Sequence, residues 1–184
     1  MTQTSQNNKN NNNNNIQTTN NLNIITHNVQ GLNNRLKLQI WLEFCHKSQY
    51  HIISMTETKI AESEYSKLIL SNPYYKIYTA NCNSTTAIKQ ESSMGTAIAV
   101  LNPLQPYIHN ILTLPGTALA VDFYFPNNKR IRIISVYLPS NNKKLNTTTQ
   151  NKVAIWIQEA TNKNYNTIVL GDFNYNLLKD STKD

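Results

Sequence analysis

The sequence has 184 residues, of which 39% are hydrophobic, and a formal net charge of +7. This length suffices for one domain with a substantial core. No apolar stretch is long enough to cross a bilayer and no signal peptide opens the chain, so the sequence excludes a membrane-spanning protein and predicts an intracellular one, in the nucleus or cytoplasm. The basic charge favours polyanionic partners such as nucleic acid.

Residues 1–22 are of low complexity, and positions 7–15 are all asparagine except Lys9. Such a composition cannot bury enough apolar surface to offset the entropy of ordering it. We therefore predict a disordered Asn-rich tail over 1–22 and a folded domain over 23–184. Cys45 and Cys82 are the only cysteines. Since they lie in no metal-binding spacing, we expect reduced, structural thiols.

The first half of the domain is predicted to open as strand, helix, strand. The helix is expected over 35–48, with an apolar stripe at Leu36, Ile40 and Phe44 that Trp41 and Cys45 widen. A single crossover of this length places the strands on either side of it parallel in one sheet. Strands are expected at 23–27, 51–55, 74–80, 95–101 and 108–114, with a short helix at 62–70 and a polar loop at 81–93.

The second half carries the clearest hairpin of the sequence. Residues 117–125 alternate around Leu119, Val121 and Phe123, turn-forming residues follow at 126–128, and 130–138 return as a second strand. A helix is then predicted over 147–162 and a buried strand over 167–171. Helices that alternate with strands, together with one antiparallel hairpin, indicate a mixed α/β (α+β) architecture.

Polar side chains follow directly after the predicted ends of four strands. They are Asn28, Glu57, Tyr137, Asp172 and Asn174. Catalytic groups in such folds gather at strand ends, so a shared sheet edge would bring two carboxylates, two carboxamides and a phenol to one cleft. Their oxygens are hard ligands matched to Mg²⁺ or Mn²⁺, which would polarise a phosphate diester while a carboxylate orients a water.

Each of these residues also has an ordinary structural explanation that spacing alone leaves open. Asn28 precedes a turn, and Glu57 can be solvated beside Lys59. Asp172 can cap the local backbone, and Tyr137 can be a strand aromatic with its hydroxyl at the surface. The four histidines fall in no metal-ligand spacing and are expected to be structural or surface residues.

Five segments, in sequence order, resemble the motifs of the endonuclease/exonuclease/phosphatase superfamily. They are THNVQGL at 26–32, SMTETK at 54–59, GTAIAVL at 95–101, ISVYLPS at 134–140 and LGDFN at 170–174. The resemblance implies a two-sheet mixed β-sandwich flanked by helices. The motifs look closest to those of abasic-site endonucleases and of non-LTR retrotransposon endonuclease domains. That branch implies DNA, abasic or target-site, as the substrate and Mg²⁺ or Mn²⁺ as the cofactor.

The resemblance also implies a role for each of the five residues. Glu57 would be the principal metal ligand, with Asn28 near the metal and the scissile phosphate. Tyr137 would contact the phosphate. Asp172 would position or deprotonate the attacking water, and Asn174 would hold the oxyanion or the nucleophile.

The family's closing Ser-Asp-His motif does not occur before Asp184. We therefore expect a domain incomplete at its C-terminus, with unpaired sheet edges that favour self-association. The expected activity is that of a Mg²⁺-dependent endonuclease, reduced by the missing motif. Two alternatives stay open: a non-catalytic remnant that binds nucleic acid, and a phosphatase or phospholipid-hydrolysing member of the same superfamily.

Overall fold

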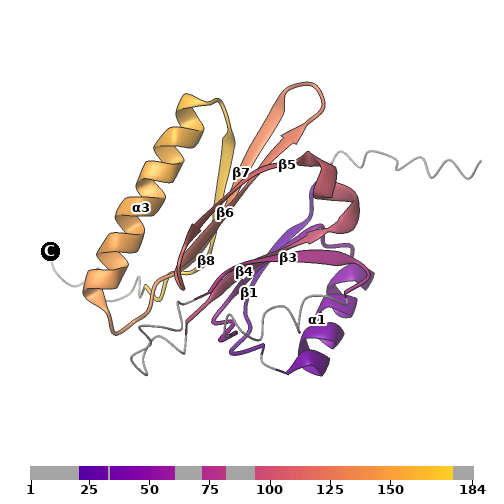
Figure 1. The fold of residues 1–184 in the computed structure, drawn as a ribbon, viewed down its shortest axis with the longest axis horizontal. Coiled ribbons are helices and arrows are strands. Elements are labelled where there is room, and N and C mark those ends of the chain that lie inside the picture. Colours follow the sequence, from indigo (N-terminus) through magenta and orange to yellow (C-terminus); the bar gives the residue numbers. More distant parts are fainter. Residues whose placement is uncertain (1–20, 33, 61–71, 82–93, 176–184) are drawn as a thin grey trace, which may run out of the picture.

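The computed structural model describes residues 21–32, 34–60, 72–81 and 94–175, which form two four-stranded sheets (Figure 1). In the first sheet, of order β1-β2-β4-β3, β1 (Ile24–Asn28) is parallel to β2 (Ile52–Thr56), and β4 (Thr96–Leu101) is antiparallel to both β2 and β3 (Tyr75–Ala80). The second sheet has the order β5-β6-β7-β8. Its strands β5 (Ile108–Leu114), β6 (Ala118–Phe125) and β7 (Lys129–Tyr137) are antiparallel, and β8 (Asn166–Asp172) is parallel to β7.

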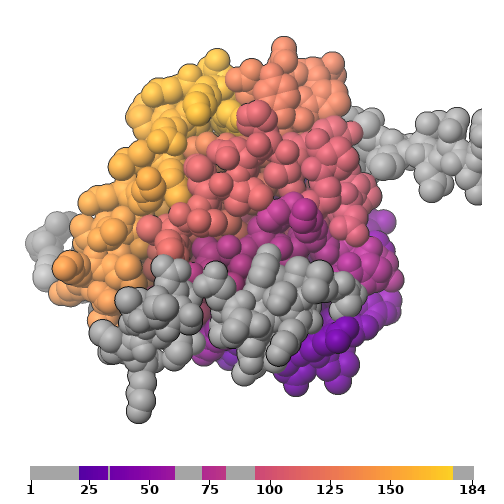
Figure 2. Space-filling view, in the orientation of Figure 1, coloured from indigo at the N-terminus to yellow at the C-terminus, as the bar shows by residue number. Residues whose placement is uncertain are grey.

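The two sheets pack face to face, and one helix covers the outer face of each. Helix α1 (Arg35–Lys47) lies on the first sheet and α3 (Lys143–Asn162) on the second, with a separate apolar core in each of the three interfaces. The core between the sheets is built around fully buried side chains such as Ile98, Leu119 and Phe123. The space-filling view places the indigo residues of the described N-terminal part and α3 on opposite sides of the molecule (Figure 2). The predicted two-sheet sandwich with flanking helices is confirmed.

Helix α1 buries Cys45 of its predicted apolar stripe but leaves the centre of that stripe exposed. The residues packed against the sheet are Leu38, Leu42 and Cys45. In contrast, Leu36, Ile40 and Phe44 keep 63%, 59% and 53% of their surface exposed. The helix carries two apolar stripes, and packing on one sheet buries only one of them.

Several predicted bounds differ from those of the structure. Helix α3 begins at Lys143 rather than at 147, because the Asn142 side chain accepts the Leu145 N–H at 3.0 Å and caps the helix. A 3₁₀-helix, η2 (Asn102–Tyr107), follows β4 where the sequence predicted only a strand end. The predicted helix at 62–70 and most of the polar loop and Asn-rich tail lie outside the described residues. No helix of the described part could span a membrane.

Strands β1 and β8, which lie at the margins of their sheets within the described ranges, contact each other across the sandwich. The two sheets are also joined between β2 and β7. There the buried hydroxyls of Ser54 and Ser135 form a hydrogen bond of 2.6 Å. Strands β1, β2, β7 and β8 all run toward the same end of the molecule. Their C-terminal ends therefore form one edge on which the loops that follow them meet.

Candidate functional site

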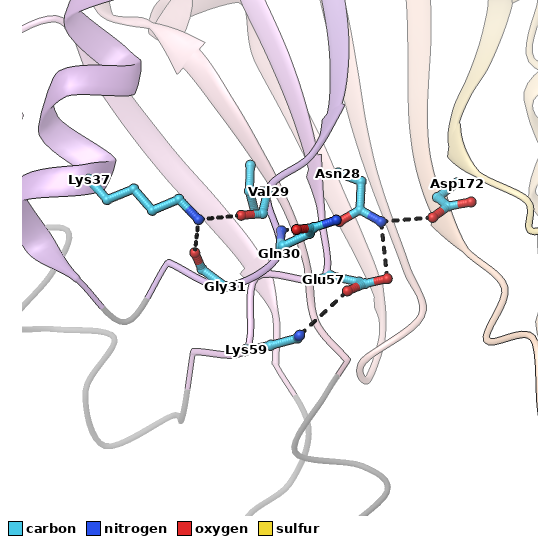
Figure 3. A network of polar contacts seen from close by, with 8 residues as sticks. All are labelled: Asn28, Val29, Gln30, Gly31, Lys37, Glu57, Lys59 and Asp172. Atoms are coloured by element: carbon cyan, nitrogen blue, oxygen red, sulfur yellow. Dashed lines mark hydrogen bonds and ion pairs between the residues drawn. The ribbon is translucent and has the colours of Figure 1, made fainter.

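All five residues predicted from the sequence lie at this edge. Asn28 ends β1 and Glu57 directly follows β2, while Tyr137 ends β7, Asp172 ends β8 and Asn174 comes two residues later. Figure 3 shows Asn28, Glu57 and Asp172 turned toward one another. The edge thus unites side chains from both sheets, and the two of them that Asn28 and Asp172 contribute are 144 positions apart in the sequence.

The Asn28 amide links the two carboxylates. Its Nδ2 donates to Glu57 Oε1 at 3.0 Å and to Asp172 Oδ2 at 2.9 Å (Figure 3). Its Oδ1 accepts the backbone N–H of Gln30 at 3.1 Å, which fixes the orientation of the amide. Since both N–H groups of one amide are occupied by carboxylates, Asn28 holds together two negative charges that would otherwise repel each other.

Tyr137 is almost fully buried beside the same carboxylates. Burial raises the pKa of Tyr137 to about 12, and the charge of Glu57, a hydrogen bond to that carboxylate and the charge of Asp172 reinforce the increase. The phenol therefore stays protonated at neutral pH and can donate a hydrogen bond.

The turn after β8 positions Asp172 and Asn174. The backbone N–H of Asn174 donates to Asp172 Oδ1 at 3.0 Å, and its side-chain Nδ2 donates to the carbonyl of Leu138 at 2.8 Å. Gly171 allows β8 to approach β7 this closely. Its φ is +140°, and a Cβ atom there would lie 1.9 Å from the carbonyl oxygen of Val136. A side chain at this position would therefore displace the turn that carries Asp172 and Asn174.

The backbone that carries Glu57 is held on both sides. On one side, the N–H groups of Gly31 and Leu32 donate to the carbonyls of Glu57 and Thr58, each at 2.7 Å. On the other, the Thr58 N–H donates to the Gly95 carbonyl at 3.1 Å. Glu57 has a φ of +53°, a conformation that is strained for a residue with a side chain and that is often found at functional sites.

A cleft of about 580 Å³ opens beside these groups. It is lined by Thr26, His27, Asn28, Gly171, Asp172, Phe173, Asn174 and Tyr175. Sequence reasoning missed His27 and Phe173 as cleft residues. Their positions next to Asn28 and Asp172 were the available signal, since neighbours of a functional residue at a strand end share its edge.

Sequence reasoning also left Lys59 without a role. Its Nζ lies 3.5 Å from Glu57 Oε2, so a positive charge stands within the site (Figure 3). A second lysine, Lys37, stabilises the loop after β1 by donating to the carbonyls of Val29 at 2.7 Å and Gly31 at 3.0 Å. Lys37 supports the backbone, whereas Lys59 faces the carboxylate directly.

The donor atoms of the site suit a hard divalent cation. The carboxylates of Glu57 and Asp172 both lie within 3.0 Å of the amide nitrogen that separates them. No group of three or more His, Cys, Asp and Glu side chains occurs in the described part of the chain, so a tetrahedral Zn²⁺ centre has no ligand set there. Mg²⁺, which keeps several waters and needs only one or two carboxylates, fits this arrangement.

The model of the Endonuclease/Exonuclease/phosphatase family matches residues 25–184. No curated protein sequence matches the chain. The fold is that of several solved structures of low sequence identity. One is the Xenopus laevis APE2 catalytic domain, with 17% identity and a TM-score of 0.56 over 83% of this chain and 58% of that one. Another is the endonuclease domain of TRAS1, a telomere-specific non-LTR retrotransposon, with 12% identity and a TM-score of 0.54 over 85% of this chain and 62% of that one. A third is D. rerio TDP2 complexed with single-strand DNA product, with 16% identity and a TM-score of 0.59 over 87% of this chain and 63% of that one. The chain thus spans 58–63% of the length of these structures.

Proposed function

The chain belongs to the endonuclease/exonuclease/phosphatase family, and on that premise we propose that it hydrolyses phosphodiester bonds of DNA with the help of a divalent cation. The observation that carries the proposal is the bridge from Asn28 Nδ2 to both Glu57 and Asp172. Two carboxylates held at one point by an amide, one of them, Asp172, lining an open cleft, are suited to bind a cation and to activate a water.

Three findings support DNA as the substrate. The net charge of +7 favours a polyanion. The open cleft exposes 43% of Phe173 beside Asp172, which offers an aromatic surface for a base. Two of the structures with this fold are an endonuclease domain of a retrotransposon and an enzyme with a DNA product. We propose abasic or target-site DNA as the substrate and a mobile element as the origin.

Glu57 and Asn28 would hold the cation, Mg²⁺ or Mn²⁺. Glu57 supplies carboxylate oxygens, and Asn28 Oδ1 keeps a lone pair beyond the one that accepts the Gln30 N–H. When bound, the cation supplies Lewis-acid polarisation of the phosphate and neutralises the charge that develops on it.

The remaining residues act on the water and the phosphate. The Asp172 carboxylate, oriented by the Asn28 amide and the Asn174 N–H, accepts the proton of the attacking water. The hydroxyl of Tyr137, which stays protonated and is hydrogen-bonded to Glu57 in the absence of substrate, would turn to donate to a non-bridging phosphate oxygen when DNA binds. The Asn174 side chain, held at the Leu138 carbonyl, turns to the phosphate or the nucleophile once substrate enters.

Self-association belongs to the same proposal. The exposed stripe of Leu36, Ile40 and Phe44 on α1 lies near β1, one edge of which pairs with no strand of the described part of the chain. Apolar patches and open strand edges of this kind favour association between copies. Phe44→Glu is expected to increase the monomer fraction in size-exclusion chromatography with light scattering. An unchanged elution profile at all concentrations would argue against this surface.

A nicking assay tests the proposed activity. Supercoiled DNA and abasic-site duplexes are incubated with Mg²⁺ and the protein, its Glu57→Ala variant, or Lys129→Met as a control at the other end of β7. We expect the protein and the Lys129→Met control to nick DNA. A chelator should abolish this nicking, and the Glu57→Ala variant should show none. Salt-dependent DNA binding without nicking, by protein shown to be folded, would support a non-catalytic remnant. Phosphate release from small phosphomonoesters would support a phosphatase.

A further inference from the structure

Both oxygens of the Glu57 carboxylate have a partner in the structure. Oε1 accepts from Asn28 Nδ2 at 3.0 Å, and Oε2 faces Lys59 Nζ at 3.5 Å (Figure 3). The amide is part of the catalytic arrangement, but the ammonium has no role in the mechanism described above. A cation that binds Glu57 therefore meets a positive charge that already stands at one of its oxygens.

Lys59 combines a fixed backbone with a movable head group. Its N–H donates to the Met94 carbonyl at 3.0 Å, and its φ of +54° repeats the left-handed conformation of Glu57. The Lys59 side chain is 36% exposed, and that of Glu57 is 21% exposed. Within the described ranges, Glu57 is the only carboxylate with which Lys59 pairs. The ammonium can thus leave Glu57 without breaking another ion pair among the described residues.

We propose that Lys59 is the resident counter-ion of Glu57, which a divalent cation displaces and which then binds a non-bridging oxygen of the DNA phosphate. This inference rests on the proposed function. A divalent cation and an ammonium compete for Oε2 and repel each other, and the cation carries twice the charge. The ammonium is a mobile point charge on a flexible stem, and phosphate is a strong partner for it.

The proposal differs measurably from a solvated surface ion pair. Such a pair contributes little, and its loss would leave cation affinity unchanged. A resident counter-ion instead lowers cation affinity and strengthens substrate binding, so its removal shifts the two quantities in opposite directions. The counter-ion role also makes DNA binding depend on the cation, because Lys59 is released to the phosphate only when the cation is bound.

The first experiment is a Mn²⁺ titration followed by electron paramagnetic resonance, without DNA. The proteins compared are the wild type, Lys59→Met, Lys59→Arg and Lys129→Met. Lys129 begins β7 and Tyr137 ends it, so the control removes the same charge roughly 26 Å from the site. We expect Lys59→Met to bind Mn²⁺ about fivefold more tightly. The Lys59→Arg and Lys129→Met variants should bind it as the wild type does.

The second experiment measures binding of a short labelled DNA duplex by fluorescence anisotropy, with each variant in an Asp172→Asn background to suppress cleavage. With Mn²⁺, Lys59→Met should weaken binding about threefold to tenfold relative to Lys129→Met, and Lys59→Arg should restore it. Without Mn²⁺, Lys59→Met and Lys129→Met should bind DNA equally. Circular dichroism melting of each protein verifies that the variants are folded.

The outcomes separate this inference from the proposed function. If Mn²⁺ binds the wild type but not Glu57→Gln, and Lys59→Met has wild-type affinity, the counter-ion role is wrong and the proposed function stands. Equal DNA binding by Lys59→Met and Lys129→Met in the presence of Mn²⁺ would also overturn the role. If Mn²⁺ binds the wild type and Glu57→Gln equally, or binds neither, both the cation site and the inference fail.

Discussion

The Asn28 bridge makes a sharp prediction about stability. Replacing Asn28 with Asp keeps the shape of the side chain but turns a donor into a third carboxylate. The new oxygen would stand about 3 Å from Glu57 and about 3 Å from Asp172 in place of the hydrogen bonds now seen at 3.0 and 2.9 Å. Asn28→Asp is therefore expected to destabilise the protein in the absence of a divalent cation.

The magnitude follows from these distances. Two like charges about 3 Å apart repel by roughly 5 kcal/mol at an effective dielectric constant of about 20, and the new carboxylate makes two such pairs before screening and relaxation. Glu57 and its partners are partly exposed, and salt screens the charges, so we expect a net loss of about 3 kcal/mol. For a domain of this size, that loss lowers Tm by roughly 6–12 °C. Asn28→Ala removes the donors without adding charge and should cost about 1–2 kcal/mol.

Thermal melting with and without Mg²⁺ measures both effects. Mg²⁺ should raise the Tm of Asn28→Asp more than that of the wild type, because the cation replaces the lost amide between the carboxylates. It should not restore Asn28→Ala in the same way. Two results would mean that the three side chains do not share the site described. One is a Tm of Asn28→Asp equal to that of the wild type in the presence of chelator, and the other is a Tm of Asn28→Asp that Mg²⁺ does not raise.

Three further changes test the frame that supports the site. Gly171→Ala forces a Cβ to within 1.9 Å of the Val136 carbonyl at a φ of +140°, so a loss of about 3 kcal/mol or more is expected in denaturant melts. Asp122→Ala removes the two bonds of 2.6 and 2.7 Å to Arg132, which is 1% exposed, and leaves it only the longer ion pair to Glu159 at 3.9 Å, which should cost about 3 kcal/mol. Burial raises the pKa of Cys45 to about 12, so in a variant lacking the other cysteine this thiol should react with Ellman's reagent at pH 8 only on unfolding. Wild-type stability of the first two variants, or rapid labelling of the folded third, would contradict these assignments.

Periodicity was sufficient for the strands but not for the helix faces. The large apolar residues at every second position of β6, followed by a turn sequence, predicted the hairpin of β6 and β7. Helix α1 carries two apolar stripes, and only the sheet decides that Leu42 is buried while Ile40 is exposed. Helix α3 begins earlier than predicted because the Asn142 side chain caps it. Asn142 lies in a polar segment, so its composition predicted a loop rather than the start of a helix.

The candidate site was predictable as a set of residues but not as a set of contacts. Asn28, Glu57, Tyr137 and Asp172 each end or follow a strand, and that position predicted their shared edge. The pairing of Asn28 with Asp172 could not be predicted, because it joins two different sheets. The approach of Lys59 to Glu57 depends on positive φ values at both residues, which their side chains do not indicate.

A double-mutant cycle of cleavage rates tests the central claim most directly. Glu57→Gln and Asp172→Asn are measured singly and together on one DNA substrate with Mg²⁺. If the two carboxylates act as one unit through Asn28, each single change lowers kcat by roughly a thousandfold, and the double variant is no slower than the slower single one. Losses that multiply in the double variant would mean that the carboxylates work independently. Cleavage that survives both changes would place the active site elsewhere.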